Sequence, residues 1–162
     1  VAFLPLGGSG KDWQQEGCAA YQQMVSRLRT AGEMAKQEGI TIGIRTGMDA
    51  KFDKKLLKKV GSSQIKVYYN FQDAADHHRD IYKELRKLGA RRIVQIHASN
   101  TDSVNLQEDP EINLPKIRKT LDKMGWSGWL VVERSRDVKR VRDVKYNFGR
   151  NIAYLKQVFQ ER

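Results

Sequence analysis

The chain has 162 residues, a length that suits one domain, and 40% of these residues are hydrophobic while 30% are charged. Its apolar runs fall far short of the roughly 20 residues needed to span a bilayer, and its first residues lack the pattern of a signal peptide, so the sequence predicts a soluble globular protein of unknown compartment. A net charge of +11 favours anionic partners, and a single cysteine, Cys18, excludes both an internal disulfide and a thiolate metal cluster.

Five segments with the apolar and β-branched character of strands follow one another along the chain, and a helical pattern follows each of them. The predicted strands cover residues 1–6, 40–45, 65–70, 92–97 and 129–133. The predicted helices carry apolar residues at spacings of three and four within residues 21–35, 52–60, 81–88, 117–124 and 152–159. The first four are followed by a glycine of the kind that ends helices: Gly39, Gly61, Gly89 and Gly125. Strand and helix alternation at this spacing predicts right-handed crossovers and a parallel sheet.

Loops follow the predicted strands, and loops at strand carboxyl ends are where α/β folds keep their sites. A glycine-rich loop at residues 7–10 follows the first strand. It lacks both the Walker ending and the dinucleotide spacing, so we predict a flexible loop rather than a phosphate cradle. Longer loops are predicted at residues 100–109 and 135–146.

Successive side chains of a strand point to opposite faces of the sheet, and the two sets differ in chemistry here. One set is apolar and is predicted to face helices: Ile42, Ile44, Val67, Tyr69, Val94, Ile96, Leu130 and Val132. The other set becomes polar towards the carboxyl ends: Thr41, Gly43, Arg45, Tyr68, Asn70, Gln95, His97, Val131 and Glu133. Strands of a doubly wound sheet read as continuous apolar runs because helices cover both faces, so this alternation favours a barrel with a polar lumen.

The predicted fold class is therefore α/β, a partial (β/α)₈ TIM barrel of five parallel strand-helix units forming a single domain over residues 1–162. A complete barrel typically needs about 250 residues. We expect three strands to be missing on the N-terminal side, because the sequence starts at Val1 rather than methionine and its last strand and helix resemble a finished end. Either a missing N-terminal segment or self-association would complete the barrel and cover its open edges.

Four polar strand ends, Arg45, Asn70, His97 and Glu133, are predicted to converge at the barrel mouth, where such barrels carry their catalytic residues. Glu133, His97 and Arg45 are the candidate catalytic residues. His97 and Glu133 are also the candidate metal ligands, because Asn70 offers only an amide oxygen and Arg45 cannot ligate a cation. A packed, hydrogen-bonded histidine and a buried ion pair between Glu133 and Arg45 are the structural alternatives.

Five stretches carry a resemblance to a known family: residues 43–46 (GIRT), 67–71 (VYYNF), 80–85 (DIYKEL), 95–97 (QIH) and 125–133 (GWSGWLVVE). On these stretches the sequence resembles the sugar phosphate isomerase/epimerase family, the xylose-isomerase-like barrels. The resemblance covers essentially the whole chain, as the C-terminal five units of that family.

The resemblance implies one divalent metal, Mn, Mg, Co or Zn, held by a Glu, an Asp, a His and a second Glu at four consecutive strand ends. The two glutamates of the family act as acid and base on a sugar carbon. His97 and Glu133 match the last two ligands, whereas Arg45 and Asn70 stand in place of the first Glu and the Asp. The net ligand charge thus changes from minus three to near zero, which disfavours a tightly held ion. We predict that the Arg45 guanidinium stands where the metal would lie and pairs with Glu133 through a charge-assisted fork.

Five residues are candidates for substrate binding: Asn70, Gln72, Asp73, Trp13 and Arg136. Trp13 follows the first strand and can stack on a sugar ring. Arg136 belongs to a group of arginines after the last strand, which either bind a phosphate or are simply exposed. His77 and His78 are typical of a solvated helix start.

The function favoured by these residues is that of a sugar or sugar phosphate isomerase or epimerase, which transfers a proton at a sugar carbon. A non-catalytic carbohydrate-binding barrel is the alternative, and it predicts saturable binding without turnover. The basic charge and the abasic-site endonucleases, which are similar barrels, add a nucleic-acid enzyme as a remote hypothesis. Three histidines and the lack of a basic-aromatic stripe argue against nucleic acid. The expected partner is a small-molecule sugar or sugar phosphate, with no membrane involved.

Overall fold

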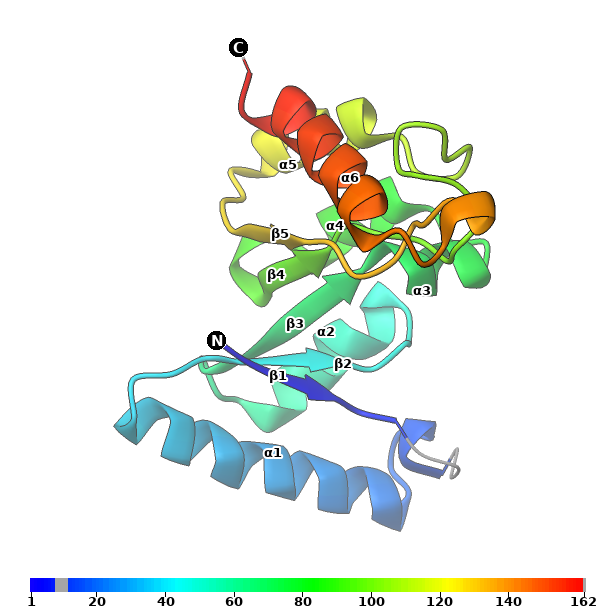
Figure 1. Ribbon diagram of the computed structural model, residues 1–162. Coiled ribbons are helices and arrows are strands. Elements are labelled where there is room, and N and C mark those ends of the chain that lie inside the picture. Colours follow the sequence, from blue (N-terminus) through cyan, green and yellow to red (C-terminus); the bar gives the residue numbers. More distant parts are fainter. Residues whose placement is uncertain (8–11, 162) are drawn as a thin grey trace.

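Residues 1–7 and 12–161 are described by the computed structural model, in which five parallel strands alternate with helices (Figure 1). The strands lie across one sheet in chain order, and all neighbouring pairs are parallel. They are β1 (Ala2–Pro5), β2 (Ile42–Arg45), β3 (Ile65–Asn70), β4 (Ile93–His97) and β5 (Trp129–Val131). The predicted α/β fold class is confirmed. The predicted glycine-rich loop falls largely on residues 8–11, which lie outside the described residues.

Five helices correspond to those that the sequence predicts: α1 (Ala19–Gln37), α2 (Ala50–Val60), α4 (Ile81–Leu88), α5 (Leu114–Met124) and α6 (Val144–Phe159). The Asp49 and Asn113 side chains accept backbone hydrogen bonds at the starts of α2 and α5. Gly61 and Gly125 end the same two helices in the left-handed conformation, which glycine adopts without strain. The last helix begins at Val144, eight residues before the predicted start, because the Asp143 side chain caps it there.

A short helix, α3 (Phe71–Asp76), has no counterpart among the predicted elements. It begins where β3 ends, because the Asn70 side chain accepts a hydrogen bond of 2.8 Å from the backbone N–H of Gln72 and so caps it. His77 is the C-cap of α3, and it and His78 are exposed in the short loop that leads from α3 to α4, close to the helix start that the sequence predicts for them. The described residues also form three 3₁₀ turns: η1 (Asp12–Gln14), η2 (Ala90–Arg92) and η3 (Val138–Arg140).

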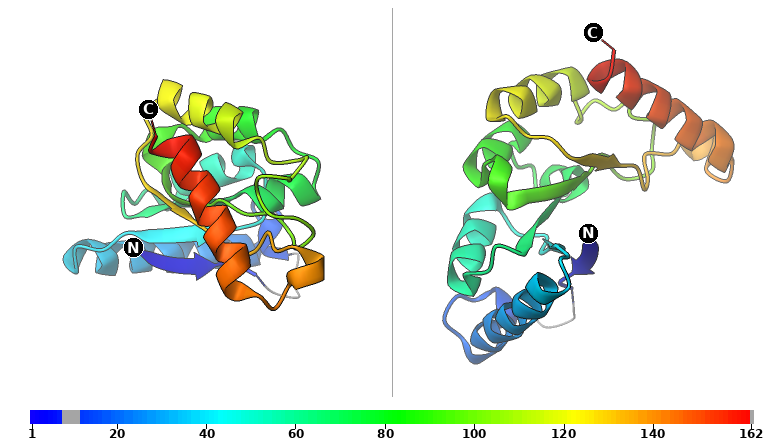
Figure 2. Two further views of the ribbon diagram at one scale, coloured as in Figure 1. Left: turned by 45° about the horizontal axis from the view of Figure 1, so that its top comes forward. Right: turned by 90° about the vertical axis from the view of Figure 1, so that its left-hand side faces the viewer.

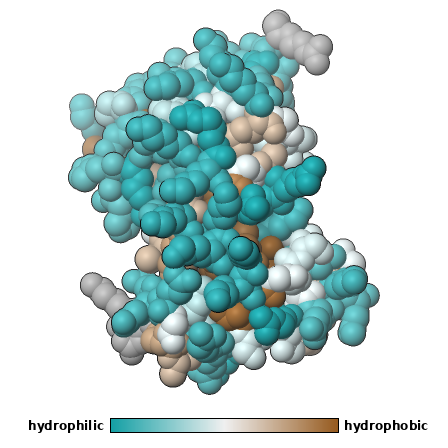
Figure 3. Space-filling view, turned by 180° about the vertical axis from the view of Figure 1, so that it is seen from behind, coloured by the Kyte–Doolittle hydropathy of each residue, from teal (hydrophilic) through white to brown (hydrophobic). Residues whose placement is uncertain are grey.

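The helices cover one face of a curved sheet. The right-hand view of Figure 2 shows them as an outer arc around the strands, with the concave side of the sheet facing away from them. The core lies between these two layers and includes Ile44, Leu56, Leu85, Ile96 and Ile117, all 0% exposed. Figure 3 shows the convex side from behind, mostly hydrophilic with some apolar surface near its middle.

The predicted alternation of the strands holds, with one exception in β4. Ile44, Val67 and Ile96 are buried in the core, as expected for the helix-facing set. The prediction for Val94 is wrong. The register shifts between the β3 residues Val67 and Tyr68, so that Val67 pairs with Ile93 whereas Tyr68 pairs with Gln95. This irregularity leaves two β4 residues opposite one step of β3, and Ile93 enters the core in place of Val94.

Val94 instead lies on the concave face, next to Gly43. A Cβ added to Gly43 would stand 2.9 Å from the Val94 Cγ1 atom and 3.1 Å from Tyr68 Cδ2. Gly43 therefore provides the space that the Val94 and Tyr68 side chains occupy in the lumen.

The sheet is open between β1 and β5, each of which has one neighbouring strand in the described part of the chain. Phe3 and Leu4 of β1 are 44% and 36% exposed, and Trp129 of β5 is 74% exposed. These are large apolar side chains at unpaired strand edges, which favour association with further strands. Among the described helices, none combines the length and the apolar character needed to cross a membrane.

A buried polar cluster ties the loop after β2 to α2, β3 and α4. Thr46 donates a hydrogen bond of 2.6 Å to the Asp53 carboxylate, and Tyr69 donates one of 3.0 Å to Glu84. Arg79 pairs with Glu84 at 3.4 Å. Burial, together with the charge of the nearby Glu84, raises the pKa of Asp53 to about 7, although the Thr46 hydrogen bond opposes the shift.

Because of this cluster, we expect the free energy of unfolding to depend on pH through Asp53, and we expect an Asp53→Asn variant to lose this dependence. Because the folded-state pKa of Asp53 exceeds its unfolded value, the folded state binds the proton more tightly and loses stability as the pH rises from about 4 to about 7. The variant, which keeps an acceptor for Thr46, should match the parent at pH 4 and exceed it by on the order of 3–4 kcal/mol at pH 8. Urea unfolding across this range measures the difference, and a difference independent of pH would contradict the assignment.

Candidate functional site

Three strand ends meet at the carboxyl edge of the sheet. Asn70 and His97 are paired in register at the ends of β3 and β4, and Asn70 Nδ2 lies 3.3 Å from His97 Nδ1. Glu133 follows β5, and its Oε2 atom lies 3.4 Å from the same histidine nitrogen. Arg45 ends β2, the strand next to β3. The main cause of the raised pKa of Arg45 is the hydrogen bonding that it donates to Asp73, and the Glu133 carboxylate is near enough to add a smaller contribution.

His97 is packed between aromatic side chains of the concave face. Its ring centroid lies 4.5 Å from that of Tyr68 and 5.4 Å from that of Phe3, and the residue is 6% exposed. Burial lowers the pKa of His97, an effect that the Glu133 carboxylate opposes. A neutral imidazole is therefore favoured at neutral pH. Glu133 has a 54% exposed side chain, so it contacts His97 on one side and solvent on the other.

The two contacts of His97 Nδ1 require opposite protonation states. The Oδ1 atom of Asn70 accepts from the backbone of Gln72, which turns the Asn70 amide N–H₂ towards His97. This amide can donate only to an Nδ1 that carries no proton, whereas the Glu133 carboxylate can accept only from an Nδ1 that carries one. A proton gained or lost at His97 thus changes its hydrogen-bonding partner while the ring stays in place.

Arg45 forms its fork with Asp73, not with Glu133 as the sequence predicted. Arg45 Nε donates to Asp73 Oδ2 at 2.9 Å, and Nη2 donates to Oδ1 at 2.6 Å. Asp73 lies in the first turn of α3, which Asn70 caps, so the unpredicted helix supplies the carboxylate. The two hydrogen bonds raise the pKa of Arg45 and use two of its five N–H groups. The remaining N–H groups are available to an oxygen-rich ligand.

Gln72 and Trp13, two further candidates for substrate binding, have their described contacts within or against helices. Gln72 Nε2 lies 3.3 Å from Asp76 within α3. Trp13, in η1, packs edge-on against Phe52 of α2 with ring centroids 6.0 Å apart. It also lines a cavity with Leu4 and Met24, so its described contacts are with the helix layer.

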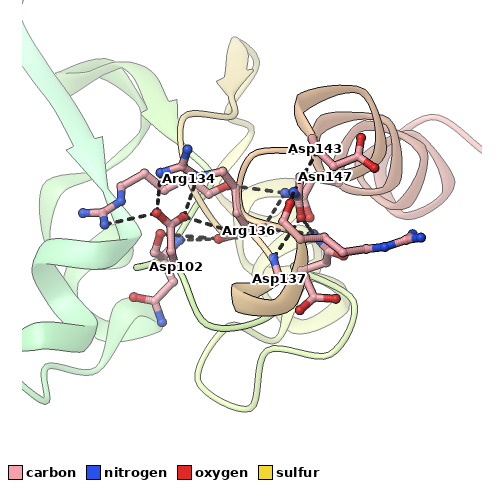
Figure 4. Close-up of polar contacts among 11 residues, drawn as sticks. Asp102, Arg134, Arg136, Asp137, Asp143 and Asn147 are labelled. Atoms are coloured by element: carbon pink, nitrogen blue, oxygen red, sulfur yellow. Dashed lines mark hydrogen bonds and ion pairs between the residues drawn. The ribbon is translucent and has the colours of Figure 1, made fainter.

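Arg136 is bound to Asp102, a residue that sequence reasoning did not single out (Figure 4). Its Nη2 and Nε atoms donate to the Asp102 carboxylate at 2.5 and 3.0 Å, and Arg134 Nη2 adds a contact of 3.3 Å. The hydrogen bonds from Arg136 are the main cause of a lowered pKa at Asp102. This cluster joins the loop after β4 to the loop after β5.

Buried asparagines hold the same two loops against α6. Asn105 donates to Asn147 Oδ1 at 3.0 Å, and Asn151 donates to the carbonyl oxygen of Ser135 at 2.8 Å. Ser135 is fully buried with a φ of 64°, a strained conformation for a serine that these bonds help to maintain. The signal in the sequence was Asn147 and Asn151, four residues apart and therefore on one face of a helix.

The residues at this mouth do not fit a divalent metal ion. Arg45 places a guanidinium where the resemblance implies a carboxylate, and the amide oxygen of Asn70 is already used to cap α3. His97 and Glu133 are then the donors that remain. In the part of the chain that the structure describes, no group of three or more His, Cys, Asp and Glu side chains is placed to hold a metal.

Five parallel strands with helices on their convex face, and polar strand ends that meet at one mouth, define a protein of the TIM-barrel class with an unclosed sheet. The family model for the xylose isomerase-like TIM barrel matches residues 1–158. The chain belongs to this family. No curated protein matches the sequence.

Solved structures share the fold at low sequence identity. A D-psicose 3-epimerase from Clostridium cellulolyticum H10 has a TM-score of 0.73 and 15% identity, over 86% of this chain and 56% of that one. A 3-keto-D-glucoside 4-epimerase from E. coli has a TM-score of 0.75 and 9% identity, over 96% and 63%. A sugar phosphate isomerase/epimerase from Parabacteroides distasonis has a TM-score of 0.71 and 17% identity, over 95% and 58%. The chain thus spans less than two thirds of the length of each.

The electrostatics of the mouth predict that metal binding can be introduced by two substitutions. Arg45→Glu together with Asn70→Asp changes the net charge of the four strand ends from about zero to about minus three, and the carboxylate introduced at position 70 can still cap α3. We expect the parent to bind neither Mn²⁺ nor Zn²⁺ tightly and the double variant to bind one equivalent, as measured by calorimetry. Arg45→Gln, which removes the guanidinium without adding a carboxylate, is the control. One equivalent of tightly bound metal in the purified parent would refute this account of the site.

Proposed function

We propose that this chain carries the pocket of a sugar isomerase or epimerase, in which the metal is replaced by the Arg45 guanidinium. The observation that supports this most directly is the contact between His97 and both Asn70 and Glu133, with the Arg45–Asp73 pair on the adjacent strand. A carboxylate and an imidazole in contact form an acid-base pair, and a fixed cation beside them can stabilise developing negative charge. The family of the chain and the sugar-transforming relatives of its fold support a sugar as the substrate.

In the proposed reaction, the Glu133 carboxylate removes a proton from the sugar carbon beside a carbonyl group. The electron pair of the broken C–H bond moves to the carbonyl oxygen, and the free N–H groups of Arg45 stabilise the resulting enediolate. The protonated Glu133 passes its proton to the neutral imidazole of His97, which it contacts, and the resulting imidazolium returns a proton to carbon, so that both side chains regain their starting states. Asp73 keeps the Arg45 side chain in place throughout, because the fork fixes the plane of the guanidinium.

A non-catalytic sugar-binding protein is the second candidate, and a specific observation favours it. The site has one carboxylate in contact with His97, and the place of the family's other glutamate is taken by Arg45, a permanent cation that is paired with Asp73. The pocket of such a protein keeps its hydrogen-bonding groups and lacks a complete pair for proton transfer. It predicts saturable sugar binding with no exchange of carbon-bound hydrogen.

Hydrogen exchange at carbon separates the two candidates. Incubation of the protein with D-fructose, D-tagatose or D-psicose in D₂O should introduce deuterium beside the carbonyl group of one of these sugars, observed by NMR, and added EDTA should leave the rate unchanged. Glu133→Gln should lower the rate by about 100-fold or more, because general-base catalysis contributes on this scale. Glu38→Gln, the same change at the C-cap of α1, is the matched control and should have no effect. Binding without exchange would instead support the second candidate, and neither binding nor exchange would refute both.

A further inference from the structure

A cavity lined by cationic side chains lies at the opposite end of the strands from the proposed sugar site. It has a volume of about 550 Å³ and is formed by α2, by the turn that leads into β3 and by η2. Five cationic side chains line it: Lys54, Lys58, Lys66, Arg91 and Arg92. Among the described residues, no aspartate or glutamate lines this cavity.

Five cations are gathered in this cavity without a carboxylate among the described residues that line it, whereas some basic residues elsewhere on the surface form ion pairs. Lys55 lies 2.7 Å from Glu16, and Lys83 lies 3.5 Å from Asp80. No ion pair joins the five cavity cations to a carboxylate within residues 1–7 and 12–161. Like charges gathered in this way repel one another, and a bound anion would relieve that repulsion.

Hydrogen-bond donors accompany the charge. The Ser62 hydroxyl oxygen accepts from the backbone N–H of Gln64, which leaves its hydrogen free to donate. The carboxyl end of α2 would normally disfavour an anion, but Arg29 donates to the carbonyl oxygens of Lys59 and Val60 there. The cavity therefore presents positive charge and donors rather than unsatisfied carbonyl groups.

We propose that this cavity binds a compact anion that carries several phosphate groups. Its volume lies within the range of about 300–1,000 Å³ that is typical of small-molecule sites. Two arginines can each bind a phosphate through two parallel hydrogen bonds, and three lysines add point charges, which matches a ligand with several negative charges. The described lining contains no aromatic side chain on which a base could stack, which argues against single-stranded nucleic acid as the occupant.

This site is independent of the proposed function. Lys66 lies near the start of β3 and Asn70 at its end, so the cavity and the proposed sugar pocket open at opposite edges of the sheet. Anion binding to the cavity can therefore be measured in variants that leave the residues of the proposed sugar site unchanged.

The test uses inorganic tripolyphosphate as the probe, with binding followed by calorimetry and by thermal unfolding. We expect one equivalent to bind, the melting temperature to rise with ligand concentration, and the affinity to fall as salt is added. Lys54→Glu combined with Lys58→Glu reverses two charges one helical turn apart and should weaken binding by about tenfold or more. Lys119→Glu with Lys123→Glu, the same change at the same spacing on α5, should alter binding by less than about twofold.

Three results would overturn the proposal. The first is that tripolyphosphate does not bind at millimolar concentration. The second is that the α5 control variant loses as much affinity for tripolyphosphate as the α2 double variant does. The third is that a DNA duplex binds more tightly than tripolyphosphate and that the α2 double variant abolishes this DNA binding. Circular dichroism establishes that each variant is folded. If the α2 double variant does not fold, Arg91→Gln, an exposed change in η2, takes its place and should weaken binding by about threefold or more, whereas unchanged binding would contradict the assignment.

Discussion

Among the elements that the structure describes, helices cover only one face of the parallel sheet, and the other features of this structure depend on that constraint. Helices bury the convex face and leave the concave face to a different set of side chains, including Phe3, Tyr68 and His97. A parallel sheet is stable when both faces are shielded, so the concave side favours closure of the strands or a bound ligand. Because all strands run the same way, their polar ends also gather at one edge of the sheet, and this gathering is a consequence of the topology.

Within that edge, Arg45 and Asp73 determine the chemistry that is available. Their fork is strong because both partners are charged and the geometry is bidentate. It fixes a positive charge on β2 next to the histidine and carboxylate pair of β4 and β5. The strand ends carry little net charge as a result, which disfavours a free divalent metal ion.

Much of this fold could be predicted from the sequence because its strands alternate regularly and its helices end on glycine. The prediction was wrong where a local detail overrode the pattern. An irregularity in β4 moves Val94 to the concave face, and a strict two-residue period cannot reveal it. The partner of Arg45 could not be predicted, because Asp73 belongs to a short helix that exists through the Asn70 cap and carries too few residues to show a period.

The asparagine network between the two long loops and α6 has a consequence for the shape of the mouth. Amide side chains neither gain nor lose protons, and hydrogen bonds between neutral groups respond weakly to dissolved ions. The asparagine bonds that hold these loops against α6 should therefore persist in acid and at high salt, whereas the ion pair between Asp102 and Arg136, which joins the two loops to each other, should weaken in acid. On the side of β2, burial raises the pKa of Asp53 to about 7, so the charge of this carboxyl group changes as the pH rises towards that value. The two sides of the mouth should therefore respond to pH in opposite directions: the contact between the loops after β4 and β5 weakens in acid, and the surroundings of β2 lose stability as the pH rises towards 7.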